Sequence, residues 1–286
     1  MAKKKVLVIL GQTATGKSSL AVDAAIKFYG EIISADSRQV YKGLDIGTGK
    51  ITKKEMRGVP HYLIDVVSPK KVFTVTQFKE LAEEKIKDII RRGKLPIICG
   101  GTGFYIDAII KNIILPEVPP NKKLRQKLEK LSTENLLSTL RKLDRKRASS
   151  IVKKNEQNNR VRIIRAIEIA EALGHVPMVK KNKSEYEFIQ IGLLVPKNIH
   201  DAKIEKRVEA MFKNGLLKEI FNLKKNGINS KRLQEFGFEY NEPTIDKVIS
   251  ETIKYAKRQM TWFKRYPEIT WLEPSQVISF LEKNLK

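Results

Sequence analysis

The N-terminal part of the chain alternates between short apolar runs and amphipathic segments. Val6–Leu10 is an uninterrupted apolar run, typical of a strand buried on both faces of a parallel sheet. Three further short runs follow, at residues 31–35, 62–64 and 95–99. Segments with apolar side chains at helical spacing separate them, at residues 19–29, 74–92 and 104–110. This alternation predicts an α/β fold with a doubly wound parallel sheet.

The pattern changes at Pro116–Pro120, where prolines interrupt the alternation. Residues 121–173 then have the pattern of charged amphipathic helices, with no strand signal between them. Strand character returns at residues 189–195, and the remaining segments are helices at 200–213, 243–264 and 275–284 with a short extended segment at 271–272. We therefore predict a catalytic α/β domain formed by residues 1–116 and 187–286, with an inserted all-helical subdomain at residues 117–186.

Residues Gly11–Ser18, with the sequence GQTATGKS, fit the pattern G-x-x-x-x-G-K-[ST] of a phosphate-binding loop. The loop lies between the first predicted strand and the first predicted helix, which is the context that the pattern requires. Backbone N–H groups at a helix N-terminus bind phosphate oxygens, Lys17 adds a positive charge, and the Ser18 hydroxyl is a suitable ligand for Mg²⁺. The loop predicts a site for a diphosphate or a triphosphate, as in ATP-binding proteins, over a plain glycine-rich turn with an exposed lysine.

The charge of the chain indicates a polyanionic partner. Lysine and arginine total 56 against 32 aspartate and glutamate residues, which gives a formal net charge of +24. A surplus of this size favours nucleic acid as the partner over a general bias towards solubility. The surplus is spread along the chain and is densest between residues 117 and 190.

Cysteine, histidine and apolar content exclude several classes of protein. A single cysteine, Cys99, excludes an internal disulfide framework and is compatible with a reducing cytoplasm. With only three scattered histidines, the chain also lacks the ligands of a zinc finger. No apolar run is long enough to cross a membrane. We expect a cytoplasmic protein that does not associate with membranes, and a monomer.

Three further motifs follow predicted strands, at the edge where a parallel sheet places its active site. They are Asp36–Tyr41 (DSRQVY), Asp45–Lys50 (DIGTGK) and Gly100–Tyr105 (GGTGFY). Together with the phosphate-binding loop they resemble the tRNA dimethylallyltransferases, also called tRNA isopentenyltransferases. Later segments resemble the same family in the same order, at residues 158–168, 215–219 and 256–263. The resemblance implies a P-loop NTPase-like fold and the short bacterial form, without the C-terminal zinc finger of eukaryotic relatives.

The chain departs from the family pattern at two places. The family usually has proline after the first loop glycine, where this chain has Gln12, and we expect that change to alter the stiffness of the loop rather than its chemistry. A His-Pro-Asn-Asp sequence is common in the inserted subdomain, where this chain has Glu156, Gln157, Asn158 and Asn159. The second change affects how the inserted subdomain would contact RNA in detail.

The resemblance implies transfer of a dimethylallyl group from dimethylallyl diphosphate to N6 of an adenosine. That adenosine lies 3′ of the anticodon, at position 37, in tRNAs that read codons beginning with U. The implied residues that bind the donor diphosphate are Gly11, Thr13, Ala14, Thr15, Gly16, Lys17, Ser18 and Arg207, with Mg²⁺ near Ser18. Asp36 is implied as the general base that accepts the N6 proton.

The resemblance also implies that tRNA is bound through its anticodon stem-loop. Around the flipped adenosine the implied residues are Asp36, Ser37, Arg38, Gln39 and Thr102, and a carboxamide such as that of Gln39 suits an adenine edge. In the inserted subdomain they are Arg125, Gln157, Asn158, Asn159, Arg160, Val161 and Arg162. For any single arginine there, a solvated helix face is an equal alternative.

Two other functions share some of these features. In a nucleotide-dependent small-molecule kinase, Asp36 or Asp65 would bind magnesium at the end of a strand, but the charge of +24 would have no role. An RNA-binding protein that uses nucleotide as a switch would explain the charge but not the Asp36–Gln39 motif. We favour the prenyltransferase, with Asp36 as the base and Asp65 in a structural role.

Overall fold

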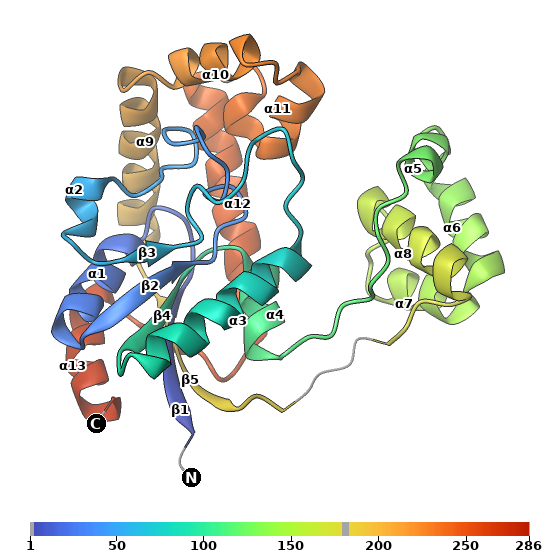
Figure 1. Ribbon diagram of the computed structural model, residues 1–286. Helices are drawn as coiled ribbons and strands as arrows, with labels where there is room; N and C mark the ends of the chain where they lie inside the picture. The colour runs from blue at the N-terminus through green and yellow to red at the C-terminus, as the bar shows by residue number, and fades with distance from the viewer. Residues whose placement is uncertain (1–2, 179–182, 286) are drawn as a thin grey trace. The chain divides into compact units, whose positions relative to one another are not determined.

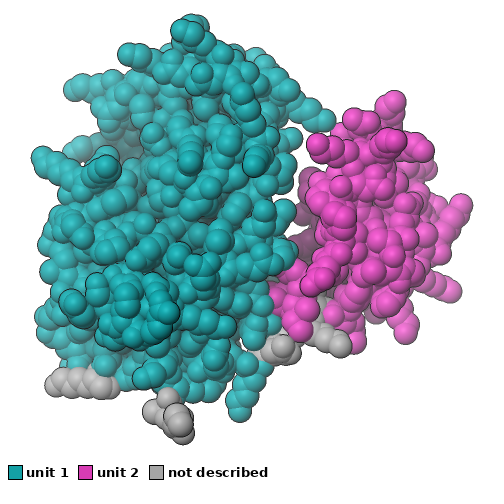
Figure 2. All heavy atoms as spheres, viewed as in Figure 1, with its two compact units in different colours: residues 1–112, 183–286 teal, residues 113–182 magenta. Residues whose placement is uncertain are grey.

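The computed structural model describes residues 3–178 and 183–285, and the chain divides into two compact units. Unit 1 comprises residues 1–112 and 183–286, and unit 2 comprises residues 113–182 (Figure 2). The observed division lies close to the predicted insertion at 117–186. It falls earlier at both ends, and after the second the strand predicted at 189–195 already begins at Tyr186.

Unit 1 is built on one six-stranded parallel sheet, with the strand order β3-β2-β4-β1-β5-β6. The strands are β1 (Lys4–Leu10), β2 (Gly30–Ser34), β3 (His61–Tyr62), β4 (Leu95–Gly100), β5 (Tyr186–Leu193) and β6 (Thr270–Leu272). The prediction of a strand at 62–64 was wrong in its extent. Leu63 and Asp65 both adopt positive φ, at 61° and 55°, and this left-handed backbone ends the strand after Tyr62.

Helices cover both faces of the sheet, as a doubly wound fold requires (Figure 1). One face packs against α1 (Lys17–Lys27) and α13 (Pro274–Asn284). The other packs against α3 (Val75–Arg91), α4 (Gly103–Ile110) and α12 (Ile245–Phe263). The predicted α/β fold class is therefore confirmed.

A second group of helices in unit 1 lies beyond the carboxyl ends of the strands (Figure 1). It comprises α2 (Lys53–Met56), α9 (Lys197–Lys213), α10 (Leu216–Lys225), α11 (Ser230–Phe236) and a short 3₁₀ helix η1 (Phe238–Tyr240). Val40, Tyr41 and Leu44 from the segment after β2 pack into the core of this group against α10 and α11. Neither α10 nor α11 is predicted from the sequence.

Unit 2 consists of four helices, α5 (Lys122–Leu128), α6 (Thr133–Leu143), α7 (Arg145–Lys153) and α8 (Arg160–Leu173). Their apolar stripes meet in a separate core that includes Leu128, Leu136, Leu140, Ile163 and Ile167. Within the described part of this unit no strand interrupts the helices.

Candidate active site

The phosphate-binding loop has the local geometry that its sequence predicts. It follows the buried strand β1 and ends at Gly16, which is the N-cap of α1 with φ 90° and ψ 13°, a left-handed conformation that glycine adopts without strain. The N–H groups in the first turn of α1 have no intrahelical partner, so they are available to an anion. The loop is thus open towards a phosphate at the start of the helix.

Two residues from distant helices hold this loop in place. The side-chain oxygen of Gln259 on α12 accepts the backbone N–H of Thr13 at 2.8 Å, while its side-chain nitrogen donates to the Gly101 carbonyl at 3.0 Å. The ring of the buried His200 on α9 donates from Nε2 to the Thr13 carbonyl at 2.8 Å. Sequence reasoning assigned no role to either residue, because nothing local to them indicates their partner.

The interior of the loop is closed by its own carbonyl and hydroxyl groups. The Gln12 carbonyl accepts hydrogen bonds from Lys17 Nζ and from Thr15 Oγ1, the latter at 2.9 Å. Thr15 is buried and its hydroxyl is engaged within the loop, so any part it has in binding the donor falls to its backbone N–H. The Gln12 side chain donates to the Ala256 carbonyl at 3.1 Å, which ties the loop to α12.

Lys17 is held in an environment that weakens its affinity for a proton. Burial lowers the pKa of Lys17 to about 8, the Arg207 charge acts in the same direction, and the Asp36 charge opposes it. An ammonium in such surroundings gains strongly from an anionic ligand, because the ligand supplies the missing counter-charge. The site is therefore poised for a phosphate group.

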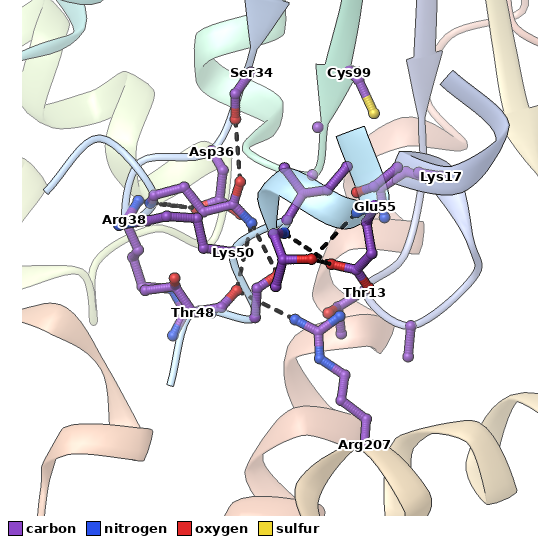
Figure 3. A pocket seen from close by; sticks show the side chains of 18 of the residues that line it. Thr13, Lys17, Ser34, Asp36, Arg38, Thr48, Lys50, Glu55, Cys99 and Arg207 are labelled. Atoms are coloured by element: carbon purple, nitrogen blue, oxygen red, sulfur yellow. Dashed lines mark hydrogen bonds between the residues drawn. The ribbon is translucent and has the colours of Figure 1, made fainter. Parts of the chain in front are cut away.

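The loop lines one side of a cavity of about 700 Å³ at the carboxyl ends of the strands. Of the residues predicted to bind the donor, the lining includes Thr13, Ala14, Gly16, Lys17, Ser18 and Arg207. Of those predicted around the adenosine, it includes Asp36, Arg38 and Gln39. Figure 3 shows Lys17, Asp36 and Arg207 reaching the cavity from α1, from the segment after β2 and from α9.

Asp36 lies two residues after the end of β2, at the start of a tight turn. Its Oδ1 accepts the backbone N–H of Arg38 at 2.9 Å and that of Gln39 at 3.4 Å. Thr102, after β4, accepts the backbone N–H of the next residue, Ser37, at 3.0 Å. The two motifs are thus joined, and they leave Asp36 Oδ2 without a hydrogen bond among the described residues.

Arg207 and Arg38 bring two further cations to the cavity. Arg207 donates to the Thr48 carbonyl at 3.2 Å (Figure 3), and burial, reinforced by the Arg38 charge, lowers its pKa. Arg38 donates from Nη1 to Glu239 at 2.5 Å. Glu239 lines the same cavity and was missed from the sequence, because it is 201 positions further along the chain.

The segment 45–50 forms another wall of the cavity. The Glu219 carboxylate on α10 accepts the backbone N–H groups of Asp45, Ile46 and Gly47 at 2.8, 2.7 and 3.1 Å. The side-chain nitrogen of Gln39 donates to carbonyls of this segment at 3.4 Å. These long bonds keep the Gln39 carboxamide at the cavity without closing it off.

Asp65, the alternative metal-binding carboxylate, does not reach the cavity. Its Oδ1 is ion-paired with Lys50 Nζ at 2.6 Å, and it is absent from the cavity lining. The structure therefore places Asp36, and not Asp65, beside the phosphate-binding loop. Among the residues that the structure describes, no group of three or more His, Cys, Asp or Glu side chains could hold a metal ion.

Comparison with known proteins decides the family. The sequence matches the model of the IPP transferase family over residues 39–266. A tRNA dimethylallyltransferase from Thermoanaerobacter sp. (strain X514) is 44% identical, with 93% of this chain and 91% of the relative aligned. One from Staphylococcus epidermidis (strain ATCC 12228) is 38% identical, with 97% and 89% aligned. The chain belongs to the IPP transferase family.

Solved structures agree with this assignment of the chain to the IPP transferases. The full-length tRNA isopentenylpyrophosphate transferase from Bacillus halodurans matches with a TM-score of 0.69 at 36% identity, covering 96% of this chain and 90% of that protein. A eukaryotic dimethylallyltransferase acting on tRNA matches with a TM-score of 0.76 at 28% identity, covering 97% and 76%. The resemblance stated from the sequence motifs is confirmed.

In this IPP transferase, several of the predicted RNA contacts in unit 2 are engaged inside the unit. Arg125 binds the buried Glu168 carboxylate through two bonds of 2.7 and 2.6 Å, and Arg160 donates to the Leu131 carbonyl at 2.7 Å. Arg162 is ion-paired with Glu156, and Asn159 caps α8. The exposed members of the predicted set are Asn158, Asn159 and Val161.

Within the described residues no helix is long and apolar enough to span a membrane. The alternatives of a kinase and of a nucleotide switch are not supported by the family assignment.

Proposed function

We propose that the chain transfers a dimethylallyl group from dimethylallyl diphosphate to N6 of the adenosine 3′ of the anticodon, in tRNAs that read codons beginning with U. The observation that carries the proposal is the convergence of Asp36, Lys17 and Arg207 on one cavity. In a member of the IPP transferase family, these groups are what a diphosphate leaving group and an amine nucleophile need.

The phosphate-binding loop binds the donor through its diphosphate. As the bond between the allylic carbon and the diphosphate oxygen breaks, negative charge accumulates on the departing diphosphate. Helix N–H groups, Lys17 and Arg207 stabilise that charge where it develops, and they are already in place before the reaction. Because this carbon–oxygen bond breaks, diphosphate is released and no phosphoryl group is transferred.

Mg²⁺ is the expected partner of the diphosphate. The Ser18 hydroxyl, at the first turn of α1 and in the cavity lining, would hold it together with diphosphate oxygens. The described residues contain no carboxylate cluster, so the ion would be held mainly by the diphosphate of the substrate. When bound, the metal neutralises part of the leaving-group charge.

Asp36 accepts the proton that N6 loses as the new carbon–nitrogen bond forms. The amine is a poor nucleophile because its lone pair is delocalised into the ring, and a general base typically contributes a factor of about 10²–10⁴. One Asp36 oxygen is held by the turn, so the other is oriented for this role. The products are the prenylated adenosine and diphosphate.

The RNA partner is the anticodon stem-loop. The adenine must leave the stack to reach the cavity, at a cost of a few kcal/mol, and Gln39 is placed to recognise its edge. The net charge of +24 and the exposed Asn158–Val161 end of α8 support RNA binding to unit 2. We infer that the protein acts as a monomer, since no obligate interface is evident in the sequence.

One experiment tests donor, acceptor and reaction together. The purified protein is incubated with dimethylallyl diphosphate, Mg²⁺ and an anticodon stem-loop that carries the adenosine, and the RNA is weighed by mass spectrometry. A gain of one dimethylallyl unit on that adenosine is the expected result. A stem-loop with guanosine at this position is the matched control and gains no mass. Unchanged RNA with the adenosine, beside a working relative as reference, would overturn the proposal.

A further inference from the structure

A buried ion pair lies in the wall of the cavity and has no part in the reaction as described so far. Arg38 Nη1 and Glu239 Oε2 are 2.5 Å apart, and only 20% and 5% of the two side chains are exposed. The guanidinium also lies over the rings of Tyr255 and Phe238, at 5.5 and 5.8 Å. Both charged residues and Tyr255 line the cavity.

The backbone is shaped to accommodate this pair. Gly237, just before η1, has φ 128°, a conformation that other residues rarely adopt. A Cβ atom at this position would lie 2.6 Å from Arg38 Nη1 and 2.8 Å from Glu239 Oε2. The positive φ therefore favours glycine where the chain passes the ion pair, and a side chain at this position would have to displace the ends of Arg38 and Glu239.

The pair is mechanically connected to Asp36. The Arg38 backbone N–H donates to Asp36 Oδ1 at 2.9 Å, so Arg38 contributes its main chain to the Asp36 turn and its side chain to Glu239. Fixing the guanidinium on η1 and α12 consequently fixes the turn in which Asp36 is held. Glu239 is the only carboxylate among the described residues for which an ion pair with Arg38 is found.

The pair also determines which cations a diphosphate meets. Arg38 is near enough to Arg207 for its charge to lower the Arg207 pKa, after the larger effect of burial. Arg38 is charged, as a guanidinium always is in a protein, and although burial lowers its pKa, the charges of Glu239 and Asp36 raise it. Its charge is nevertheless compensated by Glu239, as those of the lining residues Lys50 and Arg57 are by aspartates, which leaves Lys17 and Arg207 as the lining cations without a carboxylate partner among the described residues.

We propose that Glu239 is a positioning residue for prenyl transfer: through Arg38 it holds the Asp36 turn in its reactive place and keeps the Arg38 guanidinium away from the donor diphosphate. This inference rests on the proposed function. In this proposal Arg38 holds the Asp36 turn from within the cavity wall, in place of the RNA contact that the resemblance implies. Because buried ion pairs contribute little net stability, a role in arranging the site is a physical reason for this one.

The test is a double-mutant cycle on the single-turnover rate of prenylation, with Glu239→Gln and Arg38→Met. Glu239→Gln keeps the side-chain shape but removes the charge that compensates Arg38. We expect the rate to fall about ten- to hundredfold, the scale for small misplacement of a reacting group, with the KM for dimethylallyl diphosphate changed less than about threefold. In the Arg38→Met background, the same Glu239→Gln change should not lower the rate further, because the guanidinium through which Glu239 acts is absent.

A conservative variant and a matched control separate positioning from folding. Glu239→Asp keeps the carboxylate and should restore most of the rate. Glu235→Gln removes the partner of Arg232, a pair of the same chemistry at 2.6 Å whose guanidinium also lies over a ring, that of Phe236, and neither residue lines the cavity. This control should have the wild-type rate.

The outcomes distinguish a failure of the proposed function from a failure of the positioning role of Glu239. A wild-type protein that does not prenylate RNA contradicts the proposed function itself. A wild-type protein that prenylates, with a Glu239→Gln rate within about twofold of it, overturns the positioning role, as does a Glu239→Gln effect that persists undiminished in Arg38→Met. Should Glu239→Gln fail to fold, Arg38→Met is measured for both rate and stem-loop Kd: a rate loss of at least tenfold with the Kd changed less than about threefold supports the role, and an unchanged rate, or a loss explained by weaker RNA binding, overturns it.

Discussion

The side-chain oxygen of Gln259 accepts the backbone N–H of Thr13 at 2.8 Å, although 246 positions separate them in the sequence. The same carboxamide donates to the Gly101 carbonyl, so one buried side chain joins the phosphate-binding loop to the segment after β4. The phosphate-binding loop is thus positioned by α12 as much as by its own sequence.

Replacing Gln259 should weaken both the fold and donor binding. Gln259→Met keeps the size of the side chain but leaves the Thr13 N–H and the Gly101 carbonyl without their partner, and we expect about 1–3 kcal/mol less stability in urea unfolding. The KM for dimethylallyl diphosphate should rise. Gln234→Met, at an exposed position of α11, is the control and should change neither. A normal KM in Gln259→Met would show that the loop holds its shape alone.

Donor binding should depend on pH through Lys17. Burial, its largest cause, lowers the Lys17 pKa to about 8 in the free protein, and a bound diphosphate raises it again. Affinity is therefore full below pH 8, where Lys17 is already charged, and falls as the pH rises above 8, by up to about tenfold per pH unit. Calorimetry in two buffers of different ionisation enthalpy should detect uptake of a proton by Lys17 at pH 8.5.

A Lys17→Met variant serves as the control for that titration. It should bind the donor weakly at every pH and show no proton uptake linked to this group. If its proton uptake equals that of the wild-type protein, another group in the cavity is responsible.

Asp36→Asn should lower turnover while leaving the site assembled. Asparagine retains a side-chain oxygen that can accept the Arg38 N–H, so the turn is preserved, but it cannot take a proton from N6. We expect the single-turnover rate to fall by about 10²–10⁴ and the Kd of the stem-loop to change less than about threefold. Filter binding and quenched-flow measurements provide the two numbers. Wild-type turnover in Asp36→Asn would remove Asp36 from the mechanism.

Arg125→Met should destabilise unit 2. Its guanidinium makes two bonds to the buried Glu168, and losing them should cost about 2 kcal/mol, the range for hydrogen bonds to charged groups. Hydrogen exchange of the α8 core amides reports on this unit. Arg141→Met, on the exposed surface of α6, removes the same charge without that loss and is the matched control.

The stability that Arg125 provides should also depend on pH. Burial raises the Glu168 pKa, but the bonds from Arg125, Asn121 and Arg165 outweigh it and lower the pKa below its usual 4.5. The contribution is therefore present above about pH 4.5 and lost as the pH falls below it. The difference between the wild-type protein and Arg125→Met should shrink in acid; a constant difference would assign it to packing instead.

The sequence alone determined the features that are local in the chain. The strand, loop and helix around Gly11–Ser18 were predicted because the residues that build them are contiguous, and periodicity with glycine placement specifies each part. The insertion was recognisable for a similar reason, since proline and a change of period mark its start. The short helix α10 escaped prediction although its buried residues Leu216, Ile220 and Leu223 recur at helical spacing, a local signal that could have found it.

Only the tertiary structure decided which distant side chains complete the site. Gln259, His200 and Glu239 lie at least 158 positions from the groups that they hold, and no local pattern encodes those pairings. It also showed that Thr15 and Arg125, both typical of a binding set, are engaged in internal bonds. The physical reason is that hydrogen-bond partners and burial are properties of the packed chain: a residue's type limits what it can do, and its neighbours in space determine what it does.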